Sequence, residues 1–337
     1  MKFATFKHTG SHDGVLHLVD RKLQRAINVS DIAPTLQHAL EHWATLQRAL
    51  LDEYESLECG TIRQTIDFAA ALENGQIAAP LPRTHQWLDG SAYLSHVERV
   101  RRARGDKVPE SFYVDPLMYQ GGGDAMLGAR DDIECLSEDW GVDLEGEVGV
   151  ITGDVAMGAS AAESASSVRL LVLINDVSYR KLIPAELAKG FGFVNSKGQN
   201  ALSPVAVTPD ELGGAWCGTK GAGKLDYRLI CHVRDQWFGN PNAADDMTFS
   251  LFDLIAHAAK TRPLKAGTLI GSGTVSNHDV ATGYACIMEK RLVEQVELGA
   301  AKEDFLRFGD SIEIDMFDHH GATIFGSIKN RLIAAKK

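Results

Sequence analysis

Two glutamates, Glu145 and Glu147, stand two residues apart in the strand-like run 143–153. Alternate residues of a strand face the same side, so these side chains would lie about 7 Å apart on one face. A polar pair of this kind is more often the solvent face of a half-buried strand. The flanking leucine, valines and isoleucine, interleaved with glycines, instead indicate a strand that is covered on both faces. Two carboxylates in such a place need a positive partner, and their spacing suits one cation held between them.

Two further carboxylates lie in stretches of the sequence that also indicate a site residue. Asp89 stands in a turn-rich stretch, and Asp176 ends the β-branched and leucine run 168–176, which predicts a buried strand. Site residues are common where such a strand ends. Asp89, Asp176 and the two glutamates would then bring four carboxylates together from three segments. Oxygen-only ligands suit a hard cation better than zinc, so the sequence predicts Mg²⁺ or Ca²⁺, with Mn²⁺ also possible.

The chain has 337 residues, enough for one large domain and a smaller one. Its formal net charge of -11 argues against nucleic acid or an anionic membrane surface as a partner and favours a small or metal-bound one. The first residues lack the apolar run of a secretory signal, and no later apolar run approaches the ~18 residues of a membrane span. These observations predict a cytoplasmic protein. Five scattered cysteines without a paired motif predict reduced thiols.

Residues 1–80 are expected to form a small α+β unit that packs on the rest of the chain or acts as a lid. The sequence His12-Asp-Gly14 predicts the turn of a hairpin within residues 3–19. Leucines at helical spacing predict a helix over 34–57, and a shorter helix is expected over 62–72. The stretch 78–82 contains two prolines and predicts a linker.

Residues 84–332 are expected to form the larger domain. Apolar and β-branched runs predict strands at 168–176, 225–233, 269–275, 283–289, 311–317 and 323–328. Helices are predicted over 97–104 and 249–261. The basic residues around the first of these, Arg99 among them, are interpreted as a solvated helix face. Because strands outnumber helices, the fold class is predicted to be α+β and β-rich.

Three further motifs suggest chemistry that their surroundings do not support. The stretch 218–224 has the glycine and lysine spacing of a phosphate-binding loop, but a leucine replaces the required hydroxyl residue and a strand follows. The glycines of 267–273 lack the downstream helix of a dinucleotide-binding fingerprint. Residues 315–320 offer two aspartates and two histidines as metal ligands, yet Asp-His-His-Gly between two alternating runs is more simply the tip of a hairpin.

Four motifs occur together in the larger domain, each weak alone and specific in combination. They are Glu145-Gly-Glu147, Asn175-Asp-Val-Ser-Tyr-Arg180, the segment from Lys197 to Ser203-Pro204, and Gly271-Ser-Gly-Thr-Val-Ser276. With these motifs, residues 84 to 330 resemble the fumarylacetoacetase family. The resemblance implies the mixed β-roll of that family, a small N-terminal α+β domain before it, as in some bacterial members, and a homodimer.

The resemblance also implies roles for individual residues. It implies that Asp89 joins Glu145, Glu147 and Asp176 as a metal ligand, and that His96, seven positions after Asp89, is catalytic. Glu289 would orient His96. Lys197 would also be catalytic, and the substrate contacts would be Tyr119, Arg180 and Thr274. The chain departs from the full-length eukaryotic-type enzymes after Arg180, where Lys181 and Ile183 replace an aspartate and a glutamine at one expected oxyanion contact.

The activity that the resemblance implies is metal-dependent hydrolysis of a carbon–carbon bond in a 1,3-dicarbonyl acid. Fumarylacetoacetate and acylpyruvates, intermediates of aromatic amino-acid or aromatic compound catabolism, are the expected substrates. Arg180 and Lys197 would offset the charge of the four carboxylates and bind the substrate's carboxylate or developing enolate. His96 would activate water as a general base. Related folds also support decarboxylation, hydration and isomerisation of 2-oxo acids, and the alternative from another class is a ligand-binding relative without catalysis.

Overall fold

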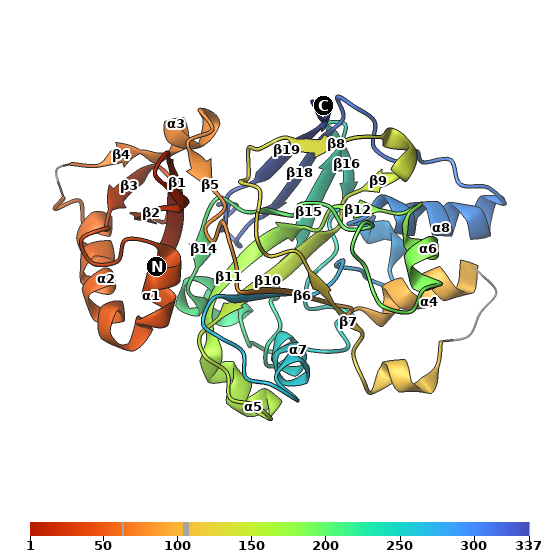
Figure 1. Ribbon diagram of the computed structural model, residues 1–337, viewed down its shortest axis with the longest axis horizontal. Helices are drawn as coiled ribbons and strands as arrows, with labels where there is room; N and C mark the ends of the chain where they lie inside the picture. The colour runs from red at the N-terminus through yellow and green to blue at the C-terminus, as the bar shows by residue number, and fades with distance from the viewer. Residues whose placement is uncertain (63, 104–107, 337) are drawn as a thin grey trace.

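The N-terminal part of the chain is a small antiparallel sheet covered by helices (Figure 1). The computed structural model describes residues 1–62, 64–103 and 108–336. Strand β1 (Lys2–His8) pairs with β2 (Ser11–Val19), and β2 pairs with β3 (Arg25–Asn28). The other elements of this part are α1 (Leu36–Glu41), α2 (Trp43–Glu58), β4 (Ile66–Asp67), α3 (Phe68–Glu73) and β5 (Ile77–Ala78).

Three local predictions for this part are wrong. The β1–β2 turn lies between His8 and Ser11, while Gly14, with a φ of +61°, sits inside β2 where the register shifts. The predicted helix over 34–57 is interrupted at His42, whose φ of -111° and ψ of 23° are not helical, and thus forms α1 and α2. Among the described residues of the second predicted helix, over 62–72, only the end is helical, because residues 66–67 are extended as β4 and α3 begins at Phe68.

The strands of the N-terminal part continue into the sheet of the larger part. That sheet adds β6 (Gln86–Gly90), β7 (Met118–Gly121), β10 (Gly146–Thr152), β11 (Val168–Asn175), β13 (Ala201–Leu202), β14 (Ala206–Val207) and β17 (Thr268–Gly271). Among the described residues its order is β4-β3-β2-β1-β14-β11-β10-β17-β6-β7, with β13 beside β11 and β5 beside β1. All pairs are antiparallel except β17 with β6. The predicted strands over 143–153 and 168–176 are therefore central strands of this sheet.

A second sheet has the order β16-β15-β18-β19-β8. Its strands are β8 (Ile133–Cys135), β15 (Leu229–Val233), β16 (Gln236–Gly239), β18 (Ser311–Met316) and β19 (Ile328–Ala334). A two-stranded ladder joins β9 (Val142–Asp143) to β12 (Ser178–Tyr179). Between β18 and β19, the side chain of Asp318 accepts hydrogen bonds from the N–H groups of His320 and Ala322, so this stretch is the predicted turn.

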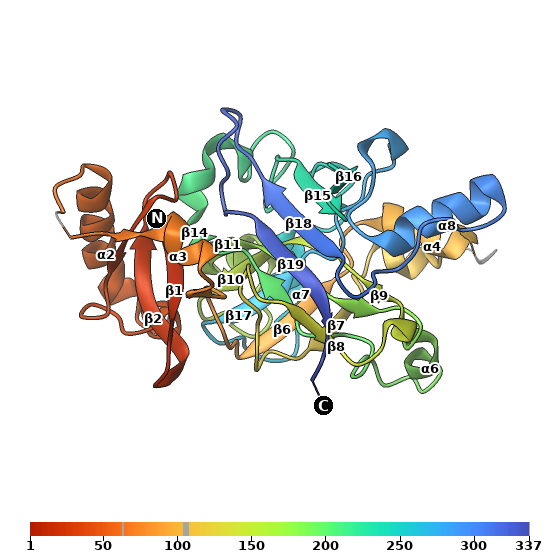
Figure 2. The same ribbon diagram turned by 90° about the horizontal axis from the view of Figure 1, so that it is seen from above.

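One predicted strand is a helix. Residues 283–289 were expected to be extended, but α8 runs over Ile287–Leu298, and Cys286 caps its N-terminus by accepting a hydrogen bond from the N–H of Glu289. The other helices are α4 (Leu94–Ala103), α5 (Ala161–Ser164), α6 (Ile183–Leu187) and α7 (Leu251–Ala258). Figures 1 and 2 show α4 and α8 side by side, at the end of the molecule away from the N-terminal part. Mixed sheets with few helices confirm the α+β, β-rich fold class.

The centre of the large sheet is buried on both faces, as the run 143–153 predicted. Every residue of β10 is buried. Along β10, Val148 and Val150 face one apolar core and Ile151 faces the other. The second of these cores also contains Leu36, Leu40 and other residues of the N-terminal helices, so it is shared between the two parts of the chain. No helix in the described part of the chain is long and apolar enough to cross a bilayer.

Candidate active site

Four buried carboxylates converge at one end of the large sheet. They are Asp89 on β6, Glu147 on β10, Glu145 just before β10, and Asp176 just after β11. One oxygen of each lies within 4.8 Å of the others, and none of these residues is more than 5% exposed. The pairing of Gly146 with Asn175 across β10 and β11 brings three of them together, as the sequence predicted.

Glycine is required beside this cluster at Gly271. This residue on β17 pairs with Asp89 on β6. A Cβ atom at Gly271 would lie 2.5 Å from Oε2 of Glu147 and 2.8 Å from Oδ1 of Asp89. Two positions later, the N–H of Gly273 donates to the same two oxygens, over 3.2 Å and 3.1 Å. The Gly-Ser-Gly segment thus lets the backbone approach the carboxylates and donate to them.

Two cations enter the cluster from the other side. Lys197 Nζ donates to Asp176 Oδ2 over 2.5 Å and to Glu145 Oε2 over 3.2 Å. Arg180 Nη1 lies 2.6 Å from Glu145 Oε1. Burial alone would lower the pKa of Lys197, but the neighbouring Asp176 and Glu145 outweigh it and raise that pKa. Lys197 is therefore an ammonium ion at neutral pH.

The four carboxylates do not ionise alike. Burial, and then the repulsion of neighbouring carboxylates, raises the pKa of Asp89 and of Glu147 well above its ordinary value. Burial also raises the pKa of Asp176, although Lys197 opposes this. For Glu145 the opposite holds, because Arg180 and Lys197 outweigh the effect of burial and lower its pKa. Lys197 and Arg180 thus stabilise the ionised form of Glu145, but these two positive charges do not balance the charge of four ionised carboxylates.

The donor atoms fit a divalent hard cation. Among the residues that the structure describes, Glu147 Oε1 and Asp176 Oδ1 are buried without a hydrogen-bond partner. A buried carboxylate oxygen without a partner is costly, and a bound cation removes that cost. All four ligands are oxygens, the set that Mg²⁺, Ca²⁺ and Mn²⁺ prefer. Asp89, Glu145, Glu147 and Asp176 are therefore the residues that would hold such an ion.

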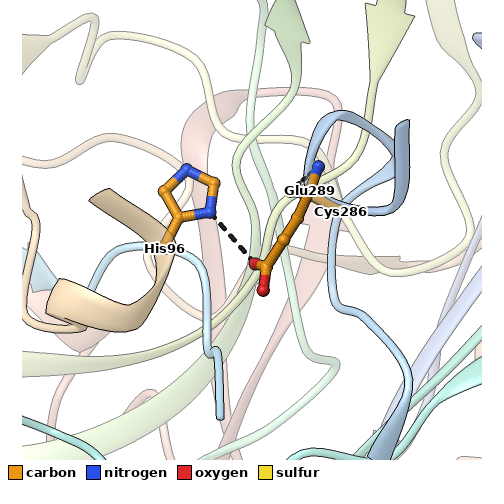
Figure 3. A group of neighbouring side chains, drawn as sticks. All are labelled: His96, Cys286 and Glu289. Atoms are coloured by element: carbon orange, nitrogen blue, oxygen red, sulfur yellow. Dashed lines mark hydrogen bonds and ion pairs between the residues drawn. The ribbon is translucent and has the colours of Figure 1, made fainter. Parts of the chain in front are cut away.

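His96 and Glu289 form a pair across two helices (Figure 3). His96 lies in the first turns of α4, and Glu289 lies in the first turn of α8. The ring nitrogen Nδ1 of His96 is 3.0 Å from Glu289 Oε2. Because an ionised carboxylate only accepts hydrogen bonds, Nδ1 donates, and in the neutral imidazole Nε2 then carries the lone pair. His96 is also one of the side chains that influence the pKa of Glu145, after Arg180 and Lys197, so the pair lies close to the carboxylate cluster.

Arg99 is a site residue that the sequence analysis missed. It was interpreted as part of a solvated face, but its side chain is only 14% exposed and forms an ion pair with Glu289 Oε1. Its guanidinium also donates to Ser276 Oγ over 3.1 Å and to the carbonyl of Asn277 over 2.6 Å. The spacing of three residues between His96 and Arg99, which puts both on one side of a helix, was the available signal. The other members of the predicted basic face, at positions 101, 102, 104 and 107, have side chains outside the described residues.

Asp143 is a second missed residue, and it joins the two halves of the site. Its carboxylate accepts hydrogen bonds from the N–H groups of Ile287 and Met288 over 2.7 Å and 2.9 Å, at the start of α8. It also accepts from Arg180 Nε over 2.7 Å. Asp143 therefore fixes α8, and with it Glu289, relative to the arginine that contacts the carboxylates. The alternation of acids at 143, 145 and 147 was the signal in the sequence.

The predicted substrate-binding residues differ in how closely they contact the carboxylate cluster. Tyr119 on β7 donates to Asp176 Oδ2 over 2.7 Å, and Lys197 Nζ lies 4.9 Å from the centre of its ring. The side chain of Arg180 is only 8% exposed, and its Nη2 has no hydrogen-bond partner among the described residues. Thr274 is buried next to Gly273 in sequence, but it takes no part in the hydrogen bonds that join the described site residues. Ile183 is half-buried at the start of α6, and its apolar side chain offers no hydrogen bond to an oxyanion.

The loop that carries Lys197 is held by Glu186 of α6. The carboxylate of Glu186 accepts hydrogen bonds from the N–H groups of Val194, Asn195 and Ser196. These backbone donors and the hydroxyl of Ser196 lower the pKa of Glu186 to about 2. These hydrogen bonds fix the position of Ser196, the residue just before Lys197. In the same loop, Phe193 packs edge-on against Tyr119, with ring centres 5.4 Å apart.

Two family models match the chain. Fumarylacetoacetate (FAA) hydrolase C-terminal matches residues 85–333, and Fumarylacetoacetase N-terminal domain 2 matches residues 1–83. A 2,4-didehydro-3-deoxy-L-rhamnonate hydrolase of Sphingomonas sp. (strain SKA58) is 28% identical over 163 residues, and the alignment spans 48% of this chain and about half, 53%, of that protein. The oxaloacetate tautomerase YisK of Bacillus subtilis (strain 168) is 25% identical over 257 residues, 73% of this chain and 71% of that protein.

Solved structures share the fold. The fumarylacetoacetate hydrolase of Exiguobacterium antarcticum superposes with a TM-score of 0.68 at 15% identity, over 99% of this chain and 100% of that one. A maleylpyruvate hydrolase of Sphingobium sp. SYK-6, in complex with manganese(II) and pyruvate, superposes with a TM-score of 0.65 at 14% identity, over 100% of both chains. At these identities the likeness establishes the fold and leaves the reaction open.

Proposed function

Because the chain belongs to the fumarylacetoacetate hydrolase family, we propose that it is a divalent-metal-dependent hydrolase of aromatic compound catabolism. It would cleave a carbon–carbon bond of a 1,3-dicarbonyl acid such as fumarylacetoacetate or an acylpyruvate. The observation that carries this proposal is the His96–Glu289 pair beside four buried carboxylates. A water-activating pair is what hydrolysis needs, whereas binding alone does not need one.

The carboxylates Asp89, Glu145, Glu147 and Asp176 would hold Mg²⁺, Ca²⁺ or Mn²⁺. The complex of the Sphingobium maleylpyruvate hydrolase with manganese(II) and pyruvate supports a divalent ion next to a 2-oxo acid in this fold. When bound, such an ion supplies Lewis-acid stabilisation for the electrons that carbon–carbon cleavage releases.

Arg180 and Lys197 would bind the negatively charged parts of the substrate. Arg180 Nε and Nη1 are held by Asp143 and Glu145, while its Nη2, which has no hydrogen-bond partner in the described part of the chain, would donate to a substrate carboxylate. Lys197 stays protonated and reaches the cluster from the loop that Glu186 holds. Its ammonium group would stabilise negative charge that develops on a carbonyl oxygen. Tyr119 would border the same space.

His96 would act as the general base. Its Nδ1 proton is held by Glu289, so Nε2 is the atom that accepts a proton from water as the water attacks the carbonyl carbon. The carboxylate of Glu289 stabilises the imidazolium that forms, and Arg99 together with Ser276 fixes the other oxygen of that carboxylate. The pair therefore keeps one tautomer and one orientation.

A second candidate is the tautomerisation or decarboxylation of a 2-oxo acid such as oxaloacetate. The relative from Bacillus subtilis that spans 73% of this chain is an oxaloacetate tautomerase. In addition, Ile183 offers no hydrogen bond at the position of an expected oxyanion contact. These reactions also pass through an enolate but need no attack by water.

One panel separates these activities. The Mg²⁺-loaded protein is incubated with fumarylacetoacetate, an acylpyruvate, oxaloacetate and a 2-oxopentenoate, and loss of the enol absorbance is followed with identification of the products. Cleavage of a 1,3-dicarbonyl into two acids is the result we expect. Carbon dioxide release or enol–keto conversion of oxaloacetate without dicarbonyl cleavage would replace the hydrolase assignment with the second candidate.

Other expectations from the sequence stay proposals. These are the division into units 1–80 and 84–332, the cytoplasmic location and the homodimer. The homodimer rests on family analogy. Light scattering of the purified protein tests it, and a monomer at all concentrations would contradict it.

A further inference from the structure

A third side chain lies against the His96–Glu289 pair. Cys286 is fully buried at the N-terminus of α8, and its sulfur accepts a hydrogen bond from the N–H of Glu289 over 3.4 Å. One ligand atom each of His96, Cys286 and Glu289 lies within 4.8 Å of the other two. The His96 side chain is 17% exposed, so the group is reached from solvent on that side. Nothing in the proposed hydrolysis uses the thiol.

We propose that His96, Cys286 and Glu289 form a zinc-binding site, and that Zn²⁺ bound there inhibits the enzyme. The three residues supply a nitrogen, a sulfur and an oxygen, and Zn²⁺ takes these donors with bonds of about 2.0 to 2.3 Å. Ligand atoms within 4.8 Å of one another close around one ion with side-chain movements of about an ångström. Three protein ligands leave the fourth position of a tetrahedral zinc ion to water.

The charges of this group also suit zinc. A thiolate and a carboxylate neutralise one Zn²⁺, and binding releases the thiol proton to solvent. Arg99 and Ser276 contact Oε1 of Glu289, which leaves Oε2 for the ion. The carboxylate cluster differs in kind, because its four oxygens favour a hard cation and it contains no sulfur. The carboxylate cluster therefore favours a hard cation, whereas the group of His96, Cys286 and Glu289 favours Zn²⁺.

Inhibition follows from the chemistry of the imidazole ring. Nδ1 of His96 faces Glu289, and Nε2 is turned away from that carboxylate (Figure 3). Zinc on Nδ1 would take the place of the shared proton and leave Nε2 protonated, so Nε2 could not accept a proton from water. Zinc on Nε2 would occupy the lone pair directly. The inhibitory effect rests on the proposed role of His96, whereas zinc binding does not.

Cobalt(II) titration tests the binding independently of activity. Co²⁺ is added to the Mg²⁺-loaded full-length protein, and the near-ultraviolet sulfur-to-cobalt charge-transfer band is recorded. The wild type and Cys135→Ser, which alters a buried cysteine elsewhere in the fold, are expected to show the band, and Cys286→Ser is expected to lack it. Serine keeps an oxygen that can cap α8, so the variant is expected to fold. A band that persists in Cys286→Ser, or no band in the wild type, overturns the proposal.

Two further measurements keep the test independent of that variant. X-ray absorption of the wild type loaded with one Zn²⁺ should show one sulfur neighbour at about 2.3 Å, and a shell without sulfur would contradict the site. With a substrate identified, Cys286→Ser should need at least about tenfold more Zn²⁺ for half-inhibition, since loss of even an outer-shell partner costs about 10- to 100-fold in metal affinity. Equal sensitivity of both proteins would place the inhibitory ion elsewhere. If no substrate is turned over, the spectra still decide whether zinc binds.

Discussion

The candidate site depends on contacts between individual side chains, which hold each functional group in one state. Glu145 is the carboxylate that cations stabilise best, and Asp89 and Glu147 are the two that burial and mutual repulsion disfavour most as anions. Glu289 is fixed by Arg99 on one oxygen and by His96 on the other. Charge complementarity thus explains why these buried acids are found together with two arginines and a lysine.

Arg99 should act as a positioning residue. We expect Arg99→Ala to lower kcat about tenfold or more with little change in KM or metal content, because Glu289 would no longer hold His96 in one orientation. Arg99→Lys keeps a cation near Glu289 and should restore part of kcat. Steady-state kinetics and metal analysis of both variants give the answer. Equal losses of kcat in the two variants together with loss of metal would mean that Arg99 only supports the fold.

Gly271 should be intolerant of any side chain. The Cβ of Gly271→Ala would clash with Glu147, Asp89 and Trp87, which should cost about 1–3 kcal/mol of stability and weaken divalent-metal binding. Gly214→Ala is the matched control, because nothing lies within 4 Å of its added Cβ. Thermal denaturation with and without Mg²⁺ compares the two. A Gly271→Ala protein with unchanged stability and metal affinity would show that the backbone need not approach the carboxylates.

Among the secondary-structure elements, β6, β11 and β17 end, and β10 begins, where the carboxylates meet, and α4 and α8 lie side by side. The sequence predicted the buried strands well, since the runs 143–153 and 168–176 are apolar on both faces. It failed at 283–289, where a short apolar run fits a strand as well as a helix. A tertiary contact favours the helix. Asp143, distant in sequence, accepts hydrogen bonds from the first N–H groups of α8.

The same limit explains what could be predicted of the site. Carboxylates two residues apart, or at the end of an apolar run, were visible because strand geometry is periodic. Arg99 was missed because its partners Ser276, Asn277 and Glu289 lie more than a hundred residues away in sequence, and Asp143 because its backbone partners in α8 do. The Asp-Gly pair at 13–14 was misinterpreted because a local turn signal also fits a bulge within a strand.

A pH effect should be visible at the end of β18. Burial raises the pKa of Asp315 from 3.8 to about 6, so its ionised form is disfavoured in the folded protein. That cost is absent below about pH 4, grows between pH 4 and 6, and reaches about 3 kcal/mol above that range. We therefore expect Asp315→Asn to raise the melting temperature at pH 7.5 and to leave it unchanged at pH 4.

The matched control for this prediction is Asp318→Asn in the adjoining turn. The N–H groups of Ala322 and His320 outweigh burial there and lower the pKa of Asp318, so its ionised form is favoured on folding. Its amide variant should lose stability at pH 7.5, with the sign opposite to that of Asp315→Asn. Thermal melts of both variants across pH 4 to 8 make the comparison. If the two variants shift in the same direction at pH 7.5, burial does not govern Asp315.

The two parts of the chain that the family models match share one sheet and one core. Strand β1 pairs with β14, and helices of the N-terminal part pack in the core that also contains Leu170 and Leu269. The N-terminal part thus covers one face of the sheet that carries the carboxylates. The net charge of -11 means that the molecule as a whole also attracts cations.

Mg²⁺ should bind at one defined site, the carboxylate cluster, although the whole molecule is negatively charged. The protein stripped with a chelator and reloaded with Mg²⁺ should bind about one Mg²⁺ per chain, because one cluster of oxygen ligands serves it. Glu145→Gln with Glu147→Gln should lose that ion. Glu294→Gln with Glu297→Gln, on α8 outside the cluster, removes the same charge and is the control. Metal analysis that finds the first double variant as fully loaded as the control would place the ion elsewhere.

The most direct test of the hydrolase proposal is to follow the oxygen of water into the product. The Mg²⁺-loaded protein is incubated with an acylpyruvate in water enriched in oxygen-18, and the masses of the acids released are measured by mass spectrometry. We predict one labelled oxygen in the carboxylic acid derived from the acyl group, formed at least about 10²-fold more slowly by His96→Ala with unchanged metal content. Turnover without carbon–carbon cleavage, or the same rate in His96→Ala, would contradict the account.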